Sequence, residues 1–491
     1  MTFIAAIVAS SVVLGVVQLV QLLRTRYNPL RHVPGPFLAS VSNTWRVLSV
    51  YREKIHLDSI DVHKIYGPVV RIGPHHVSLS SPEAFSTIHA ARTAFPKSDF
   101  YEVGTPIFRG GRVENLFSIR DVHDHALLRK NIGGLYTKAG VKQFEPQISS
   151  CVELFLRKMR DLAGNPLDMS LWLHFYAYDS LGEVNISRKF GFLESGRDVG
   201  GMIRSADRIL YMVGLLTQAT ALQYLFNVLR SLVPAEKVEP ILVTKKQFTF
   251  NTVNERRKSE KTDSKTAETD MLSSFLALHE SNPDKVSLLE VNAAIFINLM
   301  AGHDLLATTL RATWYYLAQD PAIMRALRAE IAAARQDEGL TDSDEAHLSH
   351  DKAASLPYLD AVLHETFRMH PATGTILERR VPAAGTTIDG YKLPGGTNVG
   401  VNAWVLHRDT TIFGPEASVK QRMAMKRFLF TFGAGAHTCI GQHIAMMQIV
   451  KVVAEFFYRF GVSLAHPETP WRVMGTWITK QTEMDMVATV L

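Results

Sequence analysis

The distribution of hydrophobic positions along the chain predicts a mainly helical protein. Apolar residues recur with the three-to-four-residue spacing of amphipathic helices in segments such as Val141–Arg160 and Met202–Leu232. Strand-like stretches are short and lie beside glycine or proline, at Val69–Ile72, Thr386–Tyr391 and Asn398–Val401. We therefore expect a mainly α fold with small β-sheets.

The pattern gives one polar interruption and no sign of a second hydrophobic core. Glu255–Asp270 contains no large apolar residue, which predicts a solvated loop between helical regions. We find no internal repeat. We therefore expect residues 37–491 to form one large domain.

The N-terminal segment predicts a membrane anchor over residues 1–23. Phe3 to Leu23 carries no charged residue, and a helix of that length reaches about 31 Å, the thickness of the hydrocarbon core of a bilayer. Arginines follow it in residues 24–36, a basic and proline-rich linker, and place the rest of the chain on the cytoplasmic side. A cleavable signal peptide is the alternative, but its apolar part should be shorter and preceded by positive charge.

Composition and charge exclude several classes of protein. With 46% hydrophobic and 20% charged residues, the 491-residue chain can form a core and is not intrinsically disordered. Its two cysteines, Cys151 and Cys439, exclude a disulfide scaffold and indicate a reducing compartment. The net charge of +6 suits an anionic membrane or an acidic protein. Nucleic acid is not expected as a partner, because no basic run with interspersed aromatic residues is present.

The most informative predicted helix runs from Leu288 to Gln319. Ser287 and Glu290 have the spacing of a capping box at its start, and Pro321 follows its end. Its middle reads Ala301-Gly302-His303-Asp304. The glycine could simply allow close helix packing beside a capped polar group. The alternative is a gap where a flat ligand or an oxygen species approaches the helix, with Asp304 directing protons.

Cys439 lies in a glycine-rich loop that leads into an apolar helix. Backbone N–H groups of such a loop stabilise a thiolate, which can be a nucleophile or a metal ligand. A zinc site of His437, Cys439 and His443 has too few soft ligands and the wrong spacing for a closed structural site. Haem iron held by one thiolate needs a close approach of the loop, which Gly435 and Gly441 would permit.

These residues resemble the cytochrome P-450 family. Phe432-x-x-Gly435-x-x-x-Cys439-x-Gly441 is similar to its haem-binding loop, Glu365-x-x-Arg368 to its buried Glu–Arg pair, and Ala301 to Asp304 to its oxygen-binding helix motif. The order of the motifs and the anchor also match. The segment Asn402–Asp409 is most similar to fungal microsomal members of secondary metabolism.

The resemblance implies a role for each matching residue. Haem b would be the cofactor, with its iron held by the thiolate of Cys439. His125 and Arg129 would bind haem propionates from one helix face, and Arg379 would bind another. His437 stands where the family usually has arginine, and would donate one pH-dependent hydrogen bond. The catalytic set implied by the helix motif is Ala301, Gly302 and Asp304, and the structural pair is Glu365 and Arg368.

The chain departs from the family at two places. Leu305 follows Asp304 where the family has a hydroxyl residue that helps deliver protons; Thr308 or Thr309 could replace it through a water. The Pro-Glu-Arg element that completes the Glu–Arg network is missing from the segment after Asp409. Either Arg422 or Arg427 replaces its arginine, or haem retention is weak, or the sequence lacks a segment of the working protein.

The leading function implied is a membrane-anchored monooxygenase that oxidises a lipophilic small molecule with dioxygen. Electrons would come from an NADPH-cytochrome reductase, with cytochrome b5 as a second candidate partner, and Arg129, Lys130, Lys426 and Arg427 could form its docking surface. The substrate would lie against Ala301, Leu305 and Thr373–Thr375. The location would be the endoplasmic reticulum membrane. Two alternatives remain: a haem-thiolate isomerase or dehydratase, favoured by Leu305, and a non-catalytic or truncated relative, favoured by the missing element.

Overall fold

The computed structural model describes residues 27–91, 94–105, 107–108, 111–219, 240–262, 268–340, 346–414 and 418–491. The predicted anchor over residues 1–23 lies outside this part of the chain. Within it, one helix, Leu288–Gln319 (α16), is long and apolar enough to cross a membrane. However, 56% of its most apolar window is buried inside the protein, which makes it a core helix.

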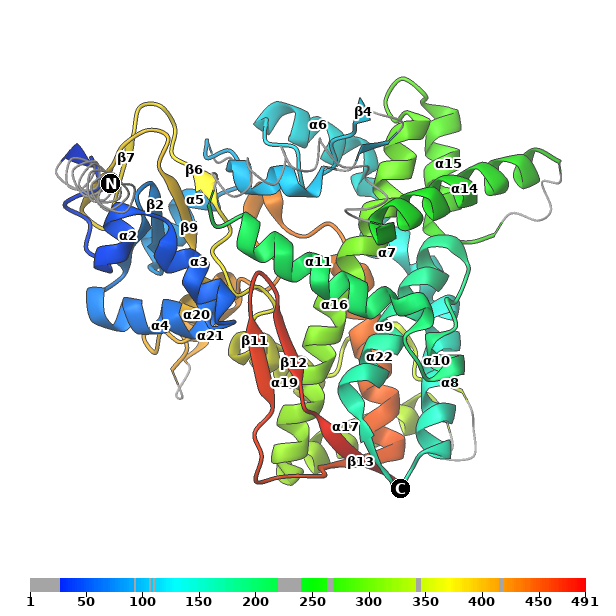
Figure 1. Ribbon diagram of the computed structural model, residues 1–491. Helices are drawn as coiled ribbons and strands as arrows, with labels where there is room; N and C mark the ends of the chain where they lie inside the picture. The colour runs from blue at the N-terminus through cyan, green and yellow to red at the C-terminus, as the bar shows by residue number, and fades with distance from the viewer. Residues whose placement is uncertain are drawn as a thin grey trace, which may run out of the picture.

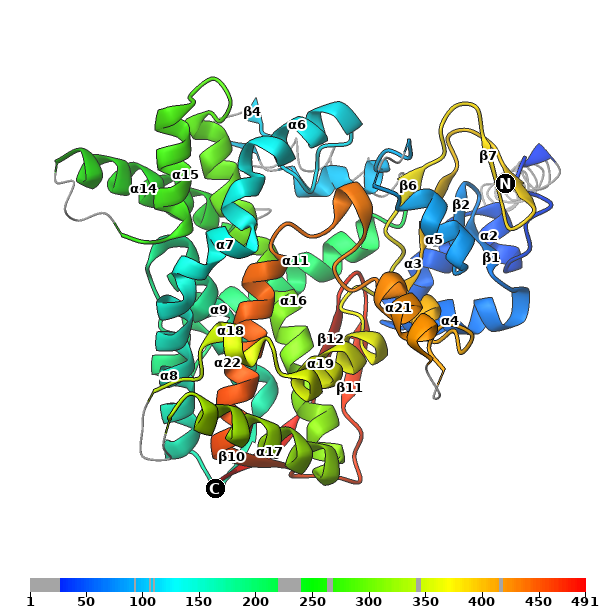
Figure 2. The same ribbon diagram turned by 180° about the vertical axis from the view of Figure 1, so that it is seen from behind.

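Helices dominate the structure, as the apolar spacing predicted (Figures 1 and 2). The helices other than α16 are α2 Phe37–Val41, α3 Thr44–Tyr51, α4 Ile55–Tyr66, α5 Pro82–Ile88, α6 Val122–Ile132, α7 Lys138–Val141, α8 Glu145–Asp161, α9 Met169–Ile186, α10 Phe192–Ser195, α11 Met202–Leu216, α14 Pro240–Thr262, α15 Met271–Ser281, α17 Pro321–Asp337, α18 His350–Ala353, α19 Pro357–Met369, α20 Ala403–Leu406, α21 Val419–Phe428 and α22 Gln442–Arg459. Among them, α16 runs through the middle of the helical region, packed along α9.

The strands form small sheets, also as predicted. The largest has the order β1-β2-β9-β6, with β2 parallel to β9 and the other pairs antiparallel. A second sheet has the order β10-β13-β5, and the rest are two-stranded. The strands are β1 Val69–Gly73, β2 His76–Leu79, β3 Ile107–Phe108, β4 Gly111–Arg112, β5 Pro166–Asp168, β6 Arg379–Arg380, β7 Thr386–Ile388, β8 Tyr391–Leu393, β9 Asn398–Val401, β10 Phe460–Leu464, β11 Arg472–Gly475, β12 Thr479–Thr482 and β13 Asp485–Val490.

The long helix agrees with its prediction at both ends. α16 covers Leu288–Gln319, and the capping box is formed: Ser287 Oγ accepts from the N–H of Glu290, whose carboxylate accepts from the N–H of Ser287 at 2.7 Å. This agreement follows from local chemistry, since both the start and stop signals act over one turn of helix.

Three other predictions were wrong in part. The polar segment predicted as a loop is helical in its first half, because α14 continues to Thr262. The stretch Thr386–Tyr391 is a hairpin, since Asp389 and Gly390 have φ values of 48° and 79° and turn the chain. The first of the two predicted amphipathic helices is broken by a 3₁₀ turn at Lys142–Phe144; the second ends at Leu216, and its residues 220–232 lie outside the described part.

Two hydrophobic cores position the cysteine loop. The larger one fills the space between the helices, and the smaller one lies around the four-stranded sheet. Phe430 and Ala434 pack against the sheet core, whereas Phe432 and Ile440 pack against the helical core. The loop therefore joins the two halves of the fold and is held from both sides.

Candidate functional site

The loop around Cys439 is built as a tight turn before α22. Gly433 and Gly435 have φ values of 69° and 63°, and a Cβ on Gly435 would collide with the carbonyl oxygens of His89 and Ala90. The N–H of Cys439 donates to the carbonyl of Phe432 at 2.7 Å. The loop conformation therefore requires glycine at Gly435 and fixes the backbone of the cysteine.

The two cysteines have different environments. Cys151 is buried in the helical core, and burial raises the pKa of its thiol. Cys439 has an exposed side chain, although it is crowded enough by protein that burial raises the pKa of its thiol as well. The N–H groups of Gly441 and Gln442, together with Arg129, oppose that shift. Cys439 is therefore an accessible thiol with three groups that favour its thiolate.

Six cationic or titratable side chains gather near this loop: Lys97, Arg129, Arg379, His89, His125 and His437. Burial and then the charges of Lys97, Arg129 and Arg379 lower the pKa of His125 to about 4. Burial, Arg379 and Arg129 lower the pKa of Lys97 to about 7, with only Glu114 opposing them. The charges of Lys97 and Arg379 thus disfavour protonation of His125 and His437, because like charges repel.

The same group contains buried nitrogen atoms without a hydrogen-bond partner in the described part of the chain. They are Arg379 Nε, His437 Nε2 and His89 Nε2. Arg379 Nη1 donates to Tyr101 Oη at 2.8 Å, while the neighbouring Glu378 carboxylate turns away to Arg46 and Ser98. A charged Arg379 N–H that lacks an acceptor, beside two imidazole nitrogens that can donate as neutral N–H groups, suits the binding of an anionic group.

α16 presents two different faces in its middle. Ala301 is exposed and Leu305, one turn later, is half-buried, although both lie in the centre of a helix that crosses the domain. His303 and Asp304 are buried on the face toward α9. A Cβ on Gly302 would lie 2.8 Å from Leu181 of α9, so this glycine permits close helix packing. The packing alternative is thus supported for Gly302, while Ala301 and Leu305 form the accessible face.

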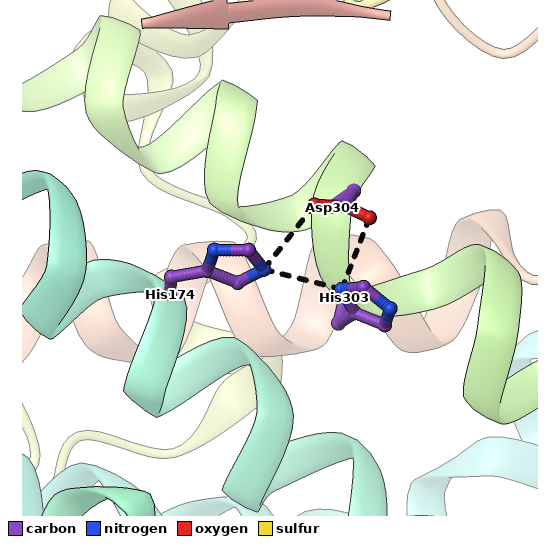
Figure 3. Close-up of side chains that lie close together, drawn as sticks. All are labelled: His174, His303 and Asp304. Atoms are coloured by element: carbon purple, nitrogen blue, oxygen red, sulfur yellow. Dashed lines mark hydrogen bonds and ion pairs between the residues drawn. The ribbon is translucent and has the colours of Figure 1, made fainter. Parts of the chain in front are cut away.

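Asp304 belongs to a buried cluster of three side chains (Figure 3). His174 Nε2 on α9 lies 3.3 Å from Asp304 Oδ1, and His303 Nδ1 lies 3.3 Å from Asp304 Oδ2. The two imidazoles are 3.1 Å apart, from His174 Nε2 to His303 Nδ1. Burial alone would raise the pKa of Asp304, but the two histidines hold it well below its ordinary value.

Comparison with known proteins identifies the family. A sequence model described as Cytochrome P450 matches residues 34–487. The chain is 34% identical over 466 residues to cytochrome P450 monooxygenase cicH of Emericella nidulans, covering 91% of each chain. The chain belongs to the cytochrome P450 family. It is also 33% identical to mpaDE of Penicillium brevicompactum, covering 95% of this chain but 56% of that protein, and 28% identical to pisatin demethylase of Fusarium vanettenii, covering 92% and 88%.

The fold agrees with this assignment. The structure superimposes on the crystal structure of the cytochrome P450DA heme domain with a TM-score of 0.75, covering 94% of this chain and 98% of that one at 13% identity. This P450 is therefore an enzyme of the monooxygenase family. Members carry haem b with a cysteine thiolate on the iron, and iron coordination deprotonates a thiol that burial alone would keep neutral. The accessible Cys439 and the unpartnered donors around it fit such a group with its two propionates.

The Glu365–Arg368 pair departs from the expectation of a buried ion pair. Arg368 Nη2 donates to Glu365 Oε1 at 2.6 Å, and Arg368 Nε donates to Glu365 Oε2 at 2.7 Å. Its third nitrogen, Nη1, donates to the carbonyl of His407 at 2.9 Å. However, the side chain of Glu365 is 59% exposed. Water can therefore solvate this carboxylate in place of the missing third partner, so the pair does not leave an unpaired buried charge. Residues 415–417, in the segment after Asp409 that lacks the Pro-Glu-Arg element, are outside the described part.

The residues proposed to replace the missing arginine and the missing hydroxyl differ in whether their side chains are free to do so. Arg427 donates to Ser86 Oγ rather than to the Glu–Arg pair. Thr309 Oγ1 donates back to the carbonyl of Leu305 at 3.1 Å, whereas Thr308 is buried with no hydrogen-bond partner for its hydroxyl within the described residues. Thr308 therefore remains the available hydroxyl, and it lies one turn from Asp304 rather than on the accessible face.

The structure defines the surroundings of several other predicted residues. Arg129 is half-buried and donates to the carbonyl of Thr438 at 2.7 Å, so it braces the loop. Gly374 donates its N–H to the carbonyl of Trp477, so the Thr373–Thr375 turn is braced by the β11–β12 hairpin. No protein atom lies within 4 Å of a Cβ added to Gly441, so protein packing does not require this glycine. His437 Nδ1 faces His125 Nε2 at 3.3 Å.

Sequence reasoning missed two members of the site. Lys97 donates to the carbonyls of Leu116 and Phe117, and its position beside Arg379 arises from an isolated bridge between distant segments. His174 reaches the cluster from a different helix. A single lysine in a loop and a single histidine in an apolar helix carry no local signal, so only the tertiary structure shows their partners.

We predict that Arg379→Met weakens haem binding by about tenfold or more, because a hydrogen bond to a charged group contributes about 1.5–3 kcal/mol. Haem content per protein and haem release to apomyoglobin measure this. Arg380→Met is the matched control, since the adjacent Arg380 is 40% exposed and pairs with Asp99. Equal haem loss in both variants would contradict the assignment of Arg379.

Proposed function

We propose that this P450 inserts one oxygen atom from dioxygen into a lipophilic small molecule of fungal secondary metabolism. The observation that carries the proposal is the pairing of an accessible thiol at Cys439 with an accessible apolar face at Ala301 and Leu305. Fungal relatives named as P450 monooxygenases support the reaction type. An apolar face at the reacting position favours an apolar substrate.

The residues of this chain have separate tasks in the proposed reaction. Haem held through Cys439 would supply the electron transfer and the activation of dioxygen. The cationic group of Arg379, Arg129, Lys97 and His125 would bind its propionates and so orient it. Ala301 and Leu305 would hold an apolar substrate and exclude water, while the ionised Asp304 would accept and pass on protons from the α9 side of the helix.

The redox partner and the location are part of the proposal. We expect an NADPH-cytochrome reductase to supply electrons, with cytochrome b5 as a second candidate donor. Lys130, Lys426 and Arg427 are exposed basic residues that suit an acidic partner. The apolar N-terminal residues 1–23 would anchor the chain in the endoplasmic reticulum membrane, with residues 24–36 as a linker and residues 37–491 facing the cytoplasm.

The test is reconstitution of the full chain with NADPH, a fungal cytochrome reductase and a panel of terpenoids, polyketides and alkaloids. Under isotopically labelled dioxygen, we expect at least one product that gains one labelled oxygen atom while NADPH is consumed. NADPH consumption, peroxide and product are measured together. A product formed without NADPH or labelled oxygen would instead support the isomerase or dehydratase alternative, and a chain that binds no haem would support the non-catalytic one.

Leu305 generates a separate prediction about proton delivery. Leucine cannot hold a water or donate a proton, so we expect much of the NADPH to be consumed with release of peroxide. Leu305→Thr restores a hydroxyl on the accessible face and should lower the ratio of peroxide to NADPH several-fold. Leu305→Val is the matched control, because valine has the shape of threonine without the hydroxyl. The same ratio in the Thr and Val variants would contradict this role of the missing hydroxyl.

A further inference from the structure

The buried cluster of His174, His303 and Asp304 contains a histidine whose protonation the structure fixes. Arg311 Nη2 lies 3.0 Å from His174 Nδ1, and Arg311 Nε donates to the carbonyl of Ser170. A guanidinium group donates hydrogen bonds and accepts none. His174 Nδ1 must therefore be the acceptor and carry no proton. In the neutral imidazole the proton is then on Nε2, which is the atom that faces Asp304 and His303 (Figure 3).

This assignment excludes a metal ion as the natural occupant of the cluster. The three side chains offer ligand atoms within 4.8 Å of one another, which by distance alone would suit a metal. A metal on His174 Nε2 would move the ring proton to Nδ1, against the N–H of Arg311. Histidine ligands normally donate their other N–H to a carboxylate or a carbonyl, and Arg311 offers neither. The cluster therefore holds protons.

His174 also cannot pass protons on readily. Burial lowers the pKa of His174 to about 3; Arg311 adds to this effect and Asp304 opposes it. Protonation would place a second charge beside the fully buried Arg311. His174 is therefore a fixed donor to Asp304 rather than a relay.

The other charged groups around the cluster lie on several elements. His303 and Arg311 belong to α16 with Asp304. Tyr178 of α9 stacks on His303 at 3.9 Å between ring centroids. Lys480 of β12 pairs with Asp207 of α11. Asp207 interacts electrostatically with Arg311, and Lys480 interacts with both Arg311 and Asp304. The Asp304 carboxylate thus has one neutral donor of fixed tautomer, His174, among groups of both signs.

We propose that His174 is a positioning residue for the oxygenation reaction: through its Nε2–H it holds the Asp304 carboxylate toward α9, away from the face of Ala301 and Leu305. The proposal rests on the proposed monooxygenase function and adds a residue outside the haem site. Release of Asp304 from His174 becomes a step in proton delivery. Because α9 and α16 pack along each other, the contact also ties proton delivery to the packing of these two helices.

The test compares His174→Phe with His174→Gln in the haem-loaded full chain. Glutamine keeps a donor toward Asp304 and an acceptor toward Arg311, whereas phenylalanine fills the space and offers neither. The readout is the infrared carbonyl-stretch band of a protonated carboxylic acid, followed against pH and assigned by its loss in Asp304→Asn. We expect its midpoint to rise by about one pH unit or more in His174→Phe, because the carboxylate loses a donor. We expect it to stay at the wild-type value in His174→Gln.

Controls separate this effect from damage to the fold. His63→Phe removes another buried, hydrogen-bonded histidine, on α4, and should leave the band unmoved. Equal reduced carbon monoxide spectra show that all variants are folded and loaded.

An unchanged midpoint in His174→Phe would overturn the proposal, as would a stoichiometric metal other than iron that is lost in that variant. The amount of peroxide released per NADPH consumed should also change in His174→Phe and should return to the wild-type value in His174→Gln. If the wild-type protein consumes no NADPH while the band shifts as expected, the monooxygenase function fails, and the effect of His174 on the Asp304 carboxylate stands without it.

Discussion

The side chain of Arg129 reaches from α6 to the carbonyl of Thr438, the residue before Cys439, and this contact shows how the site is held. The cysteine loop receives apolar contacts from both hydrophobic cores and a charged brace from α6. It also requires glycine at Gly435, where the chain passes against the backbone of His89 and Ala90. The position of one sulfur atom therefore depends on packing across the whole domain, and the cationic group is assembled around that position.

The concentration of positive charge near Cys439 is a constraint that the protein does not satisfy by itself. Lys97, Arg129 and Arg379 lower the pKa of His125, and among the described residues Glu114 opposes the effect of the two arginines on Lys97. Such a group is stabilised when an anionic ligand binds, since each charged donor then gains an acceptor. Haem binding and the folding of this region are therefore expected to be coupled.

Much of this structure could be predicted from sequence, for reasons that lie in the range of the interactions. The ends of α16 are set by a capping box and a proline, both local, and the predicted range agrees with the structure. The cysteine loop was also predictable, because its glycines and its cysteine lie within ten residues. Lys97 and His174 were missed, since each meets its partners through contacts that span distant segments. Glu365 was expected to be buried, but exposure depends on what covers a helix, which spacing along the helix cannot show.

The two faces of α16 separate the binding of substrate from the handling of protons. The apolar, accessible face at Ala301 and Leu305 suits an apolar substrate, and the buried face holds Asp304 among histidines and Arg311. A single turn of helix thus separates the reacting space from the Asp304 carboxylate. The close approach of α9 at Gly302 is what makes this separation possible, because it brings His174 within reach of Asp304.

The most direct test of the account is the reduced, carbon monoxide-treated absorption spectrum of Cys439→Ser beside Cys151→Ser. The account predicts that the red-shifted Soret band of thiolate-bound haem is present in the wild-type protein and in Cys151→Ser. It should be lost in Cys439→Ser, because only Cys439 offers an accessible thiol. Persistence of that band in Cys439→Ser, or its loss in a folded Cys151→Ser protein, would contradict the assignment of the iron ligand.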